Sequence, residues 1–465
     1  MKKQERIEGK EIKELERRRR QLNKTKAFAL PVVLLLIVLA AFVDEIATAS
    51  TGQIQSSVVN EFFVIPQGVT YNEGVAMFSG MLSVTSLFYF LCPFYKALAD
   101  KFGRKIFLAL NVVGMGIGML LCWWSPNVGI YVLGAAMISF FIQHDMQIIY
   151  LYEVVPADKR ATIYGVLKGL ANLSIIAVPV LRRVAMQDNA ALWRNIFAVP
   201  VIGCAIITVC IALGMRESGT FLRQRIAWLE KPYEERHPKK EPGKKKEKQA
   251  NQHKTGVFVG MKHLFREKQL FSILMVACSF AMVSPCIFQY VESIMHDYGM
   301  DTASITDALM LYPVIYALIM PVAGYLGDKL GRKKIVVGGG IMTIVGFAAF
   351  NVSAMLGLHP YVVGVFYGVY LGCWWTTVDF TNMMSSESVP TYNRGSVAGA
   401  GNLIALVSGF LGFALTIVAP LLFPRIGFGY MTVAIPFVLL GVIIMALRVK
   451  ETKGVDMDSI EYQNI

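Results

Sequence analysis

Charged side chains are scarce in this chain, since Asp, Glu, Lys and Arg make up only 17% of its 465 residues. A soluble globular domain carries about 25% charged residues. Here 55% of the residues are hydrophobic and the mean hydropathy is +0.51. The composition therefore excludes a soluble globular protein and indicates an integral membrane protein.

Motifs for enzymatic or ATP-driven chemistry are also missing. The pattern G-x-x-x-x-G-K-[ST] does not occur, which excludes ATP drive as far as a sequence can. The seven cysteines form no C-x-x-C pair and lie within or beside apolar runs, which indicates packing thiols and not a disulfide framework or a metal site. The six histidines are scattered, and no Ser/His/Asp cluster is visible. We therefore expect neither an enzyme nor a cofactor nor a bound metal.

Basic residues outnumber acidic ones, which gives a formal charge of +13. Such an excess can indicate nucleic-acid binding, but these residues flank apolar runs, so membrane topology explains them and we expect no nucleic-acid partner. Residues 1–26 hold eleven Lys or Arg, and no small-residue cleavage site follows the first apolar run. We predict an uncleaved cytoplasmic tail. It forms either a short surface helix or a solvated topology signal.

Twelve apolar segments are long enough to cross a hydrocarbon core of about 30 Å. They cover residues 27–51, 75–97, 106–124, 129–154, 161–182, 195–214, 269–294, 304–325, 335–354, 360–385, 395–422 and 429–448. Basic residues occupy the intervening segments on one side, with Arg182, Arg183, Arg194 and Arg425 as exceptions. This bias predicts a multi-pass protein of the cell membrane with both termini in the cytoplasm.

The basic segment 215–268 interrupts the apolar pattern and cannot bury a core. We predict a disordered or partly helical linker, which is either merely solvated or bound to anionic lipid. It divides the chain into a tail (1–26), a six-helix bundle (27–214), the linker, a second six-helix bundle (269–448) and a C-terminal tail (449–465).

A charged hairpin occurs once in each half. Residues 324–333 read GYLGDKLGRK and residues 96–105 read KALADKFGRK. The shared D-x-x-G-R-K spacing predicts a tight turn whose glycine adopts a conformation that other residues disfavour. We expect the Asp to cap a helix end and the basic residues to remain at a membrane face.

A second repeat follows the fourth and tenth segments. Both carry E-x-x-P-x-x-x-R, and their glutamates, Glu153 and Glu387, are 234 positions apart. Together with the hairpins, these motifs resemble the major facilitator superfamily. Residues 216–222 (RESGTFL) and 450–461 (KETKGVDMDSIE) are similar to the loop motifs of its sugar-porter and metabolite-symporter branch. Segment seven lacks the Q-Q-x-S-G-x-N of sugar binders, which argues against a hexose.

The resemblance implies an all-α fold of twelve transmembrane helices in two pseudo-symmetric bundles, with helices 1, 4, 7 and 10 around a central cavity. It also implies salt bridges between the halves that close a cytoplasmic gate. The gate residues would be Asp100, Arg104, Glu153, Arg160, Asp328, Arg332, Glu387 and Arg394.

Helical spacing groups polar side chains of these four helices into stripes. Glu45 points about 100° away from the stripe of helix 1, and Lys168 on helix 5 pairs with an acid, meets an anion or snorkels. Glu292 lies near the outer mouth, where it could simply be exposed. The candidates for the substrate cavity are Gln143, Gln147, Gln289, Glu292, Trp375 and Asn382.

Proton coupling requires a carboxyl group that exchanges its proton near neutral pH. Asp44 is the first candidate and Asp379 the second, because each lies on a polar stripe near mid-membrane; the alternative for both is a salt bridge between helices. His144 could relay a proton. Asp145 beside it is the remaining candidate, although a structural role explains it better.

The leading hypothesis is a secondary active transporter that moves a small polar metabolite (sugar-like, a polyol or an organic acid), with proton symport and a monomeric chain in the bilayer. The first alternative is a proton-driven exporter of drugs or metabolites. Helix 5 lacks the G-x-x-x-G-P-x-x-G-G of such exporters. The second is a non-transporting membrane sensor that uses the tail and the linker.

Overall fold

Apolar segments in a bilayer form helices because the lipid offers no partner to backbone N–H and C=O groups. The computed structural model describes residues 2–25, 30–91, 95, 98, 102–142, 146–155, 160–232, 257–389 and 394–453, and helices account for most of them. The first half contains α2 (Leu30–Gly52), α3 (Gln55–Val59), η1 (Asn60–Val64), α4 (Ile65–Gln67), α5 (Tyr71–Ser83), η2 (Val84–Leu91), α7 (Arg104–Trp124), α8 (Val128–Ile142), α9 (Met146–Val154), α10 (Arg160–Ser174), α11 (Ala177–Val184), η4 (Ala190–Phe197) and α12 (Ala198–Gly214).

The second half repeats this helical pattern. It contains α15 (Val257–Arg266), α16 (Lys268–Ser284), η5 (Pro285–Gln289), α17 (Val291–Asp297), α18 (Thr302–Leu330), α19 (Arg332–Met355), α20 (Pro360–Glu387), α21 (Arg394–Leu422) and α22 (Ile426–Arg448). Two further helices, α1 (Lys2–Thr25) and α13 (Gly219–Leu229), belong to the predicted tail and linker.

Nine helices within the described ranges are long and apolar enough to cross a membrane. The other three expected segments are divided between shorter elements, namely α5 and η2, α8 and α9, and α10 and α11. All twelve expected segments therefore overlap helical elements, while the count of twelve crossings stays a prediction.

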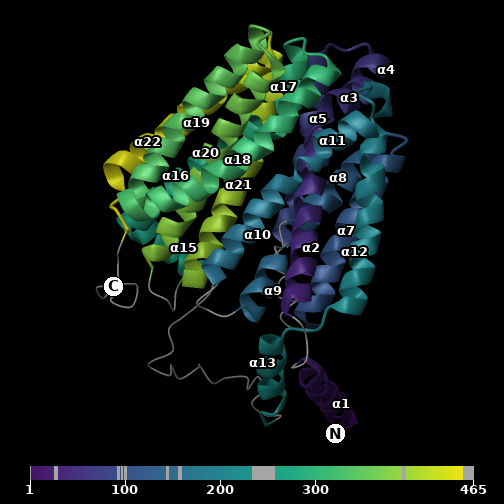
Figure 1. The fold of residues 1–465 in the computed structure, drawn as a ribbon. Coiled ribbons are helices and arrows are strands. Elements are labelled where there is room, and N and C mark those ends of the chain that lie inside the picture. Colours follow the sequence, from purple (N-terminus) through teal and green to yellow (C-terminus); the bar gives the residue numbers. More distant parts are fainter. Residues whose placement is uncertain are drawn as a thin grey trace.

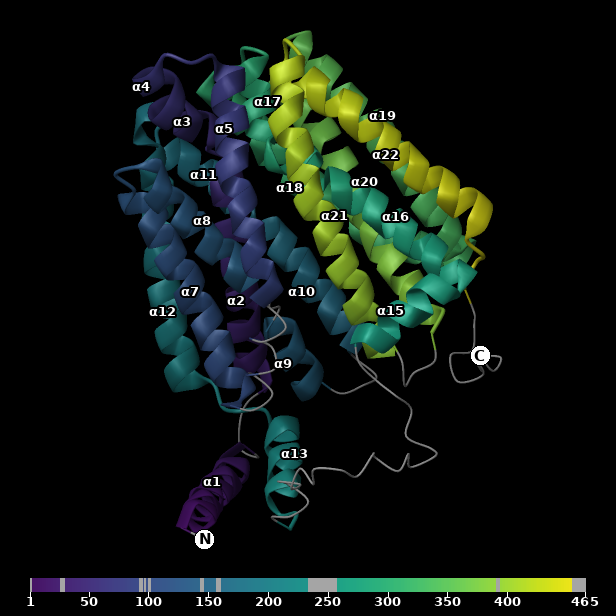
Figure 2. The same ribbon diagram turned by 180° about the vertical axis from the view of Figure 1, so that it is seen from behind.

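The two halves lie side by side as separate bundles (Figure 1). They contact each other through α10 with α18, α5 with α21, α11 with α18 and α3 with α17. The helices α1 and α13 lie beyond one end of the bundles, and α3, α4 and α17 lie at the other, as the reverse view also shows (Figure 2). We call the first end the terminal face and the second the distal face.

Two of the crossing helices are broken near the distal face. Ile54, with φ −132° and ψ 14°, separates α2 from α3. Tyr290, with φ −111° and ψ 22°, separates the π-helical turn η5 from α17. Pro285 opens η5, and a proline lacks the N–H that an α-helical turn needs at this point. Such interruptions free backbone and side-chain groups to turn toward a site.

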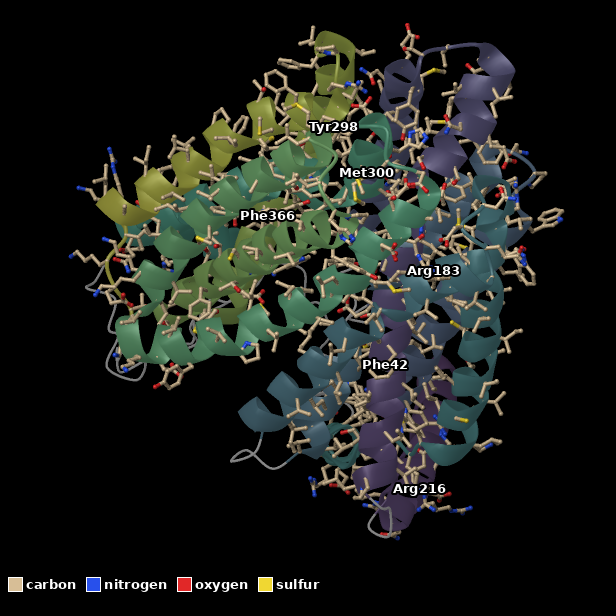
Figure 3. The ribbon with its side chains drawn as sticks, turned by 45° about the horizontal axis from the view of Figure 1, so that its top comes forward. Phe42, Arg183, Arg216, Tyr298, Met300 and Phe366 are labelled. Atoms are coloured by element: carbon tan, nitrogen blue, oxygen red, sulfur yellow. The ribbon has the colours of Figure 1, made fainter. Side chains whose placement is uncertain are left out.

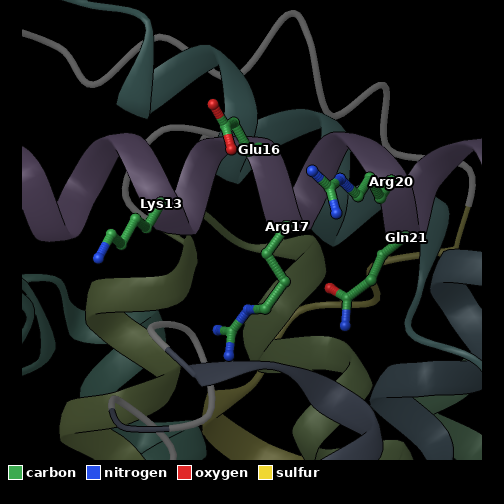
Figure 4. Close-up of a pocket in the computed structure, with 5 residues that line it drawn as sticks. All are labelled: Lys13, Glu16, Arg17, Arg20 and Gln21. Carbon is green, nitrogen blue, oxygen red and sulfur yellow. The ribbon is translucent and has the colours of Figure 1, made fainter.

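The basic tail forms the helix α1, which packs on α13 at the terminal face. Glu14 of α1 accepts hydrogen bonds from Arg225 of α13 at 3.1 and 3.0 Å. Arg19 pairs with Glu230 at 2.7 Å. The helix α1 also carries a polar hollow that contains no predicted site residue (Figure 4), lined by Lys13, Glu16, Arg17, Arg20 and Gln21.

Candidate functional site

A hydrogen bond joins α2, the first expected membrane segment, to α9 of the fourth segment in the interior of the first half. The amide Nε2 of Gln147 on α9 donates to Oδ2 of Asp44 on α2 at 2.7 Å. Gln147 is buried and Asp44 is half-buried. The first proton-coupling candidate and one cavity candidate thus lie together, on helices that the stripes predicted to face the same space.

A second acidic side chain of α2, that of Glu45, points elsewhere. Glu45 pairs with Lys168 of α10 at 4.0 Å, which is the acid partner that the sequence left open for this lysine.

Aromatic rings surround the break between η5 and α17, in the seventh expected membrane segment. Phe288 lies with its ring centroid 5.5 Å from that of Trp374 and 6.0 Å from that of Trp375. Gln289, next to Phe288, and Trp375 are both half-buried. Edge-to-face and tilted packing of this kind fixes ring positions. A substrate would meet an amide and an indole here.

The remaining candidates are dispersed. Asp379 and Asn382 on α20 are exposed. Gln143, His144 and Asp145 lie outside the described residues, so their prediction stands as made.

Glu292 is buried, contrary to the exposure that the sequence allowed. Its carboxylate accepts hydrogen bonds from the backbone N–H of Ser56 at 2.6 Å and from the Ser56 hydroxyl at 2.5 Å. Arg182 of α11 stands 3.8 Å away, and the two charged side chains are 0% and 2% exposed. Arg182 also donates to the carbonyl of Gln53 and, at 3.0 Å, to Oγ1 of Thr306. These contacts join the two halves at the distal face.

A more exposed layer surrounds this centre. Arg183 pairs with Asp307 across the halves at 2.8 Å, with side chains 44% and 29% exposed. Asn72 donates to the carbonyl of Phe423 at 3.1 Å. In Figure 3, Tyr298 and Met300 of the second half lie above Arg183 of the first half, and Arg216 lies at the opposite end.

The four arginines that are exceptions to the distribution of basic residues all have acidic partners in the structure. The pairs are Arg182 with Glu292, Arg183 with Asp307, Arg194 with Glu61 and Arg425 with Asp297.

The described gate residues pair within their own halves. Arg104 contacts Glu153 at 2.9 Å. Arg332 contacts Asp328 at 2.9 Å and Glu387 at 3.4 Å. Asp100 and the side chains of Arg160 and Arg394 lie outside the description.

The hairpin glycines adopt the conformation that the motif predicted. Gly103 has φ +126° and Gly331 has φ +103°. For Asp328 the capping expectation was wrong, because α19 begins after Gly331 without a cap from a neighbouring side chain. Asp328 lies inside the last turn of α18 instead and pairs with Arg332. Asp100 lies outside the described residues, so its part of the expectation stays a prediction.

Two glutamates that the sequence reasoning did not select perform the capping. Glu217 accepts from the backbone N–H of Arg104 at 2.8 Å and of Lys105 at 3.2 Å. Glu451 accepts from Arg332 at 2.8 Å and from Lys333 at 3.1 Å. A helix N-terminus leaves these N–H groups unpaired, and a carboxylate satisfies them. The signal was present, since Glu217 and Glu451 are 234 positions apart, like the glutamates of E-x-x-P-x-x-x-R.

Two repeated helical bundles with polar groups at their interface define a membrane transporter. The family profile described as Major Facilitator Superfamily matches residues 33–413, and the chain belongs to this family. Its relatives are transporters and not enzymes.

The chain is similar to transporters of different substrates. It is 26% identical to the glucose transporter GlcP of Staphylococcus epidermidis over 79% of this chain and 83% of that protein. It is 25% identical to the multidrug resistance protein MdtG of Yersinia enterocolitica over 76% and 81%. Among solved structures, a D-xylose-proton symporter superposes with a TM-score of 0.67 at 16% identity, over 91% of this chain and 98% of that one, which establishes the likeness of fold.

Proposed function

We propose that this chain is a proton-coupled symporter that imports a small polar metabolite, such as a sugar-like compound, a polyol or an organic acid. The observation that carries the proposal is Asp44, a carboxylate inside an apolar helix, held by Gln147 from the facing helix 4. An ionisable group within hydrocarbon is costly and marks a pathway for ions or substrate. The similarity to a glucose transporter and to a D-xylose-proton symporter supports this reading.

In this proposal Asp44 carries the proton. The Gln147 amide donates to the ionised carboxylate, and protonation of Asp44 removes the charge that this hydrogen bond stabilises. The substrate binds beside it against Gln289, Trp375 and Phe288, where amide and ring groups suit hydroxyl-bearing molecules. Asp379, His144 and Asp145 remain further candidates for the proton path, and Gln143 and Asn382 for the substrate cavity.

We assign the terminal face to the cytoplasm and the distal face to the outside of the cell membrane. The basic hairpins, tail and linker support this orientation. The structure then corresponds to a state that is closed toward the outside. When the cavity faces outward, the described gate residues would exchange their pairs within each half for pairs between the halves, in which Asp100, Arg160 and Arg394 would also take part. The working unit would be a monomer.

The test is transport into proteoliposomes with a panel of sugars, polyols, organic acids and amines. An inward proton gradient should drive accumulation by the wild-type chain, and Asp44→Asn should reduce this to equilibration without accumulation. Glu45→Gln is the matched control on the neighbouring residue and should retain accumulation. Accumulation by Asp44→Asn equal to that of wild type would transfer the coupling role to Asp379.

Export of drugs or metabolites is the second candidate, and the similarity to MdtG favours it. In the same vesicles, an exporter would move substrate out of the lumen in the direction opposite to the entering protons. No substrate would then accumulate inside under the inward proton gradient.

A further inference from the structure

Among the residues that the structure describes, one buried ion pair joins the two halves at the distal face. Arg182 belongs to α11 of the first half and Glu292 to α17 of the second, and both are shielded from solvent. A buried charge that loses its partner is strongly destabilising, whereas an exposed pair contributes little. The closed arrangement of the distal face is therefore weakened when one of the two charges is removed and the other is left buried without it.

Both residues of the pair lie at a helix break. Glu292 belongs to a broken helix, and Arg182 contacts Gln53 beside the break of another. Glu292 follows the break at Tyr290, and its hydrogen-bond partner Ser56 follows the break at Ile54. A break uncouples a short helical segment from the long helix before it. The segments α3 and α17 can therefore separate while α2 and α16 keep their places.

The network around the pair is incompletely satisfied within the described residues. Nη2 of Arg182 is buried without a hydrogen-bond partner, and so is Oε1 of Gln53, whose backbone carbonyl accepts from Arg182. Partly satisfied buried polar groups raise the free energy of the state that holds them. Closure is thus held by the ion pair and opposed by its polar surroundings, as a reversible contact requires.

We infer that Arg182 and Glu292 form the latch of the outer gate, and that they must separate and rejoin in each transport cycle. This inference rests on the alternating access of the proposed function. It assigns Glu292 to gating, in place of the substrate contact expected from its position on helix 7. Both are positioning residues, because they act by bringing α3 and α17 together.

The test is hydrogen–deuterium exchange of the full chain in lipid nanodiscs without substrate, read on peptides that cover residues 53–59 and 291–297. Glu292→Gln keeps an acceptor for Ser56 but removes the charge that pairs with Arg182 at 3.8 Å, so exchange in these peptides should rise about ten-fold or more. The double variant Arg182→Met with Glu292→Gln carries no buried charge and should return exchange to within about three-fold of wild type.

The matched control is Asp307→Asn, which removes the more exposed pair with Arg183 at the same face. It should change exchange by less than about two-fold. Glu292→Asp retains the charge and should give an intermediate rise; it replaces Glu292→Gln if that variant does not fold. The inference is overturned if loss of the Glu292 charge raises exchange no more than Asp307→Asn does, or if the double variant shows no recovery.

Uptake measurements separate this inference from the proposed function. Glu292→Gln should reduce uptake of any transported compound roughly in proportion to the lost closed population, and the double variant should recover it. If hydrogen–deuterium exchange responds as expected but a proton gradient drives no uptake, the gating role of Arg182 and Glu292 is supported and the proposal of proton symport is contradicted.

Discussion

The hairpins of the two halves share one backbone design but differ in their surroundings. In both, a glycine with positive φ precedes a helix whose first two N–H groups donate to a glutamate distant in sequence. Glu217 in the first half is 7% exposed, whereas Glu451 in the second half is exposed. The capping geometry is thus the same in the two hairpins, whereas the exposure of the capping glutamate to solvent differs.

The tail helix α1 and the start of α13 account for much of this difference. Arg18 of α1 is buried, donates to the carbonyl of Phe102 at 2.9 Å and lies over the Phe221 ring at 5.2 Å from its centroid. Arg104 lies over the same ring at 5.6 Å. The N-terminal helix is therefore attached directly to the gate hairpin of the first half.

The largest expected effect comes from removing each glutamate. Glu217→Ala leaves partly buried N–H groups without an acceptor and should lower the free energy of unfolding by about 3 kcal/mol. Glu451→Ala frees N–H groups that water reaches and should cost about 1 kcal/mol. The measurement is denaturant unfolding of both variants in detergent micelles. Equal losses would mean that burial does not distinguish the two hairpins.

Particular residues show how far the sequence alone could lead. The repeated D-x-x-G-R-K predicted the hairpins and the glycine conformation, because a tight turn is a local property. Helical spacing placed Asp44 and Gln147 on stripes of helices 1 and 4, and the structure brings the two together. Local geometry and periodicity were sufficient for both.

The partners of Glu217 and Glu292 could not be obtained in this way. Glu217 contacts Arg104 at a separation of 113 residues, and Glu292 contacts Ser56 at 236. Such contacts depend on how the helices pack and not on any local pattern. The four arginines that broke the charge rule were the available sign, since a misplaced cation requires an acidic partner from elsewhere in the fold.

A smaller effect is expected from detaching α1. Arg18→Ala removes the hydrogen bond to Phe102 and the contact with Phe221 and should cost about 1 to 2 kcal/mol. It should also bring the environment of Glu217 closer to that of Glu451. The measurement is unfolding of Arg18→Ala alone and combined with Glu217→Ala. Arg17→Ala, on the polar hollow of α1, is the control and should have little effect; strictly additive losses for Arg18 and Glu217 would show that α1 does not act through the hairpin.

The smallest effect is a pH dependence of opposite sign in the two halves. Burial, partly opposed by three backbone N–H groups, raises the pKa of Glu217 above its ordinary 4.5. Burial also acts on Glu451, but four backbone N–H groups outweigh it and lower the pKa of Glu451 below 4.5.

The raised pKa means that the folded chain binds the Glu217 proton more tightly than the unfolded chain. Stability from this residue therefore falls as the pH rises from about 4.5 through the folded pKa. For Glu451 the stabilisation is present above about 4.5 and is lost as the pH falls through its lower folded pKa. Thermal unfolding between about pH 3 and pH 7 should show that Glu217→Gln removes a decline in stability toward neutral pH, and that Glu451→Gln removes a decline in stability below about pH 4.5. Matching slopes in the two variants would mean that the covering helix α1 leaves the electrostatics of the hairpin unchanged, and the difference between the halves would then reduce to packing.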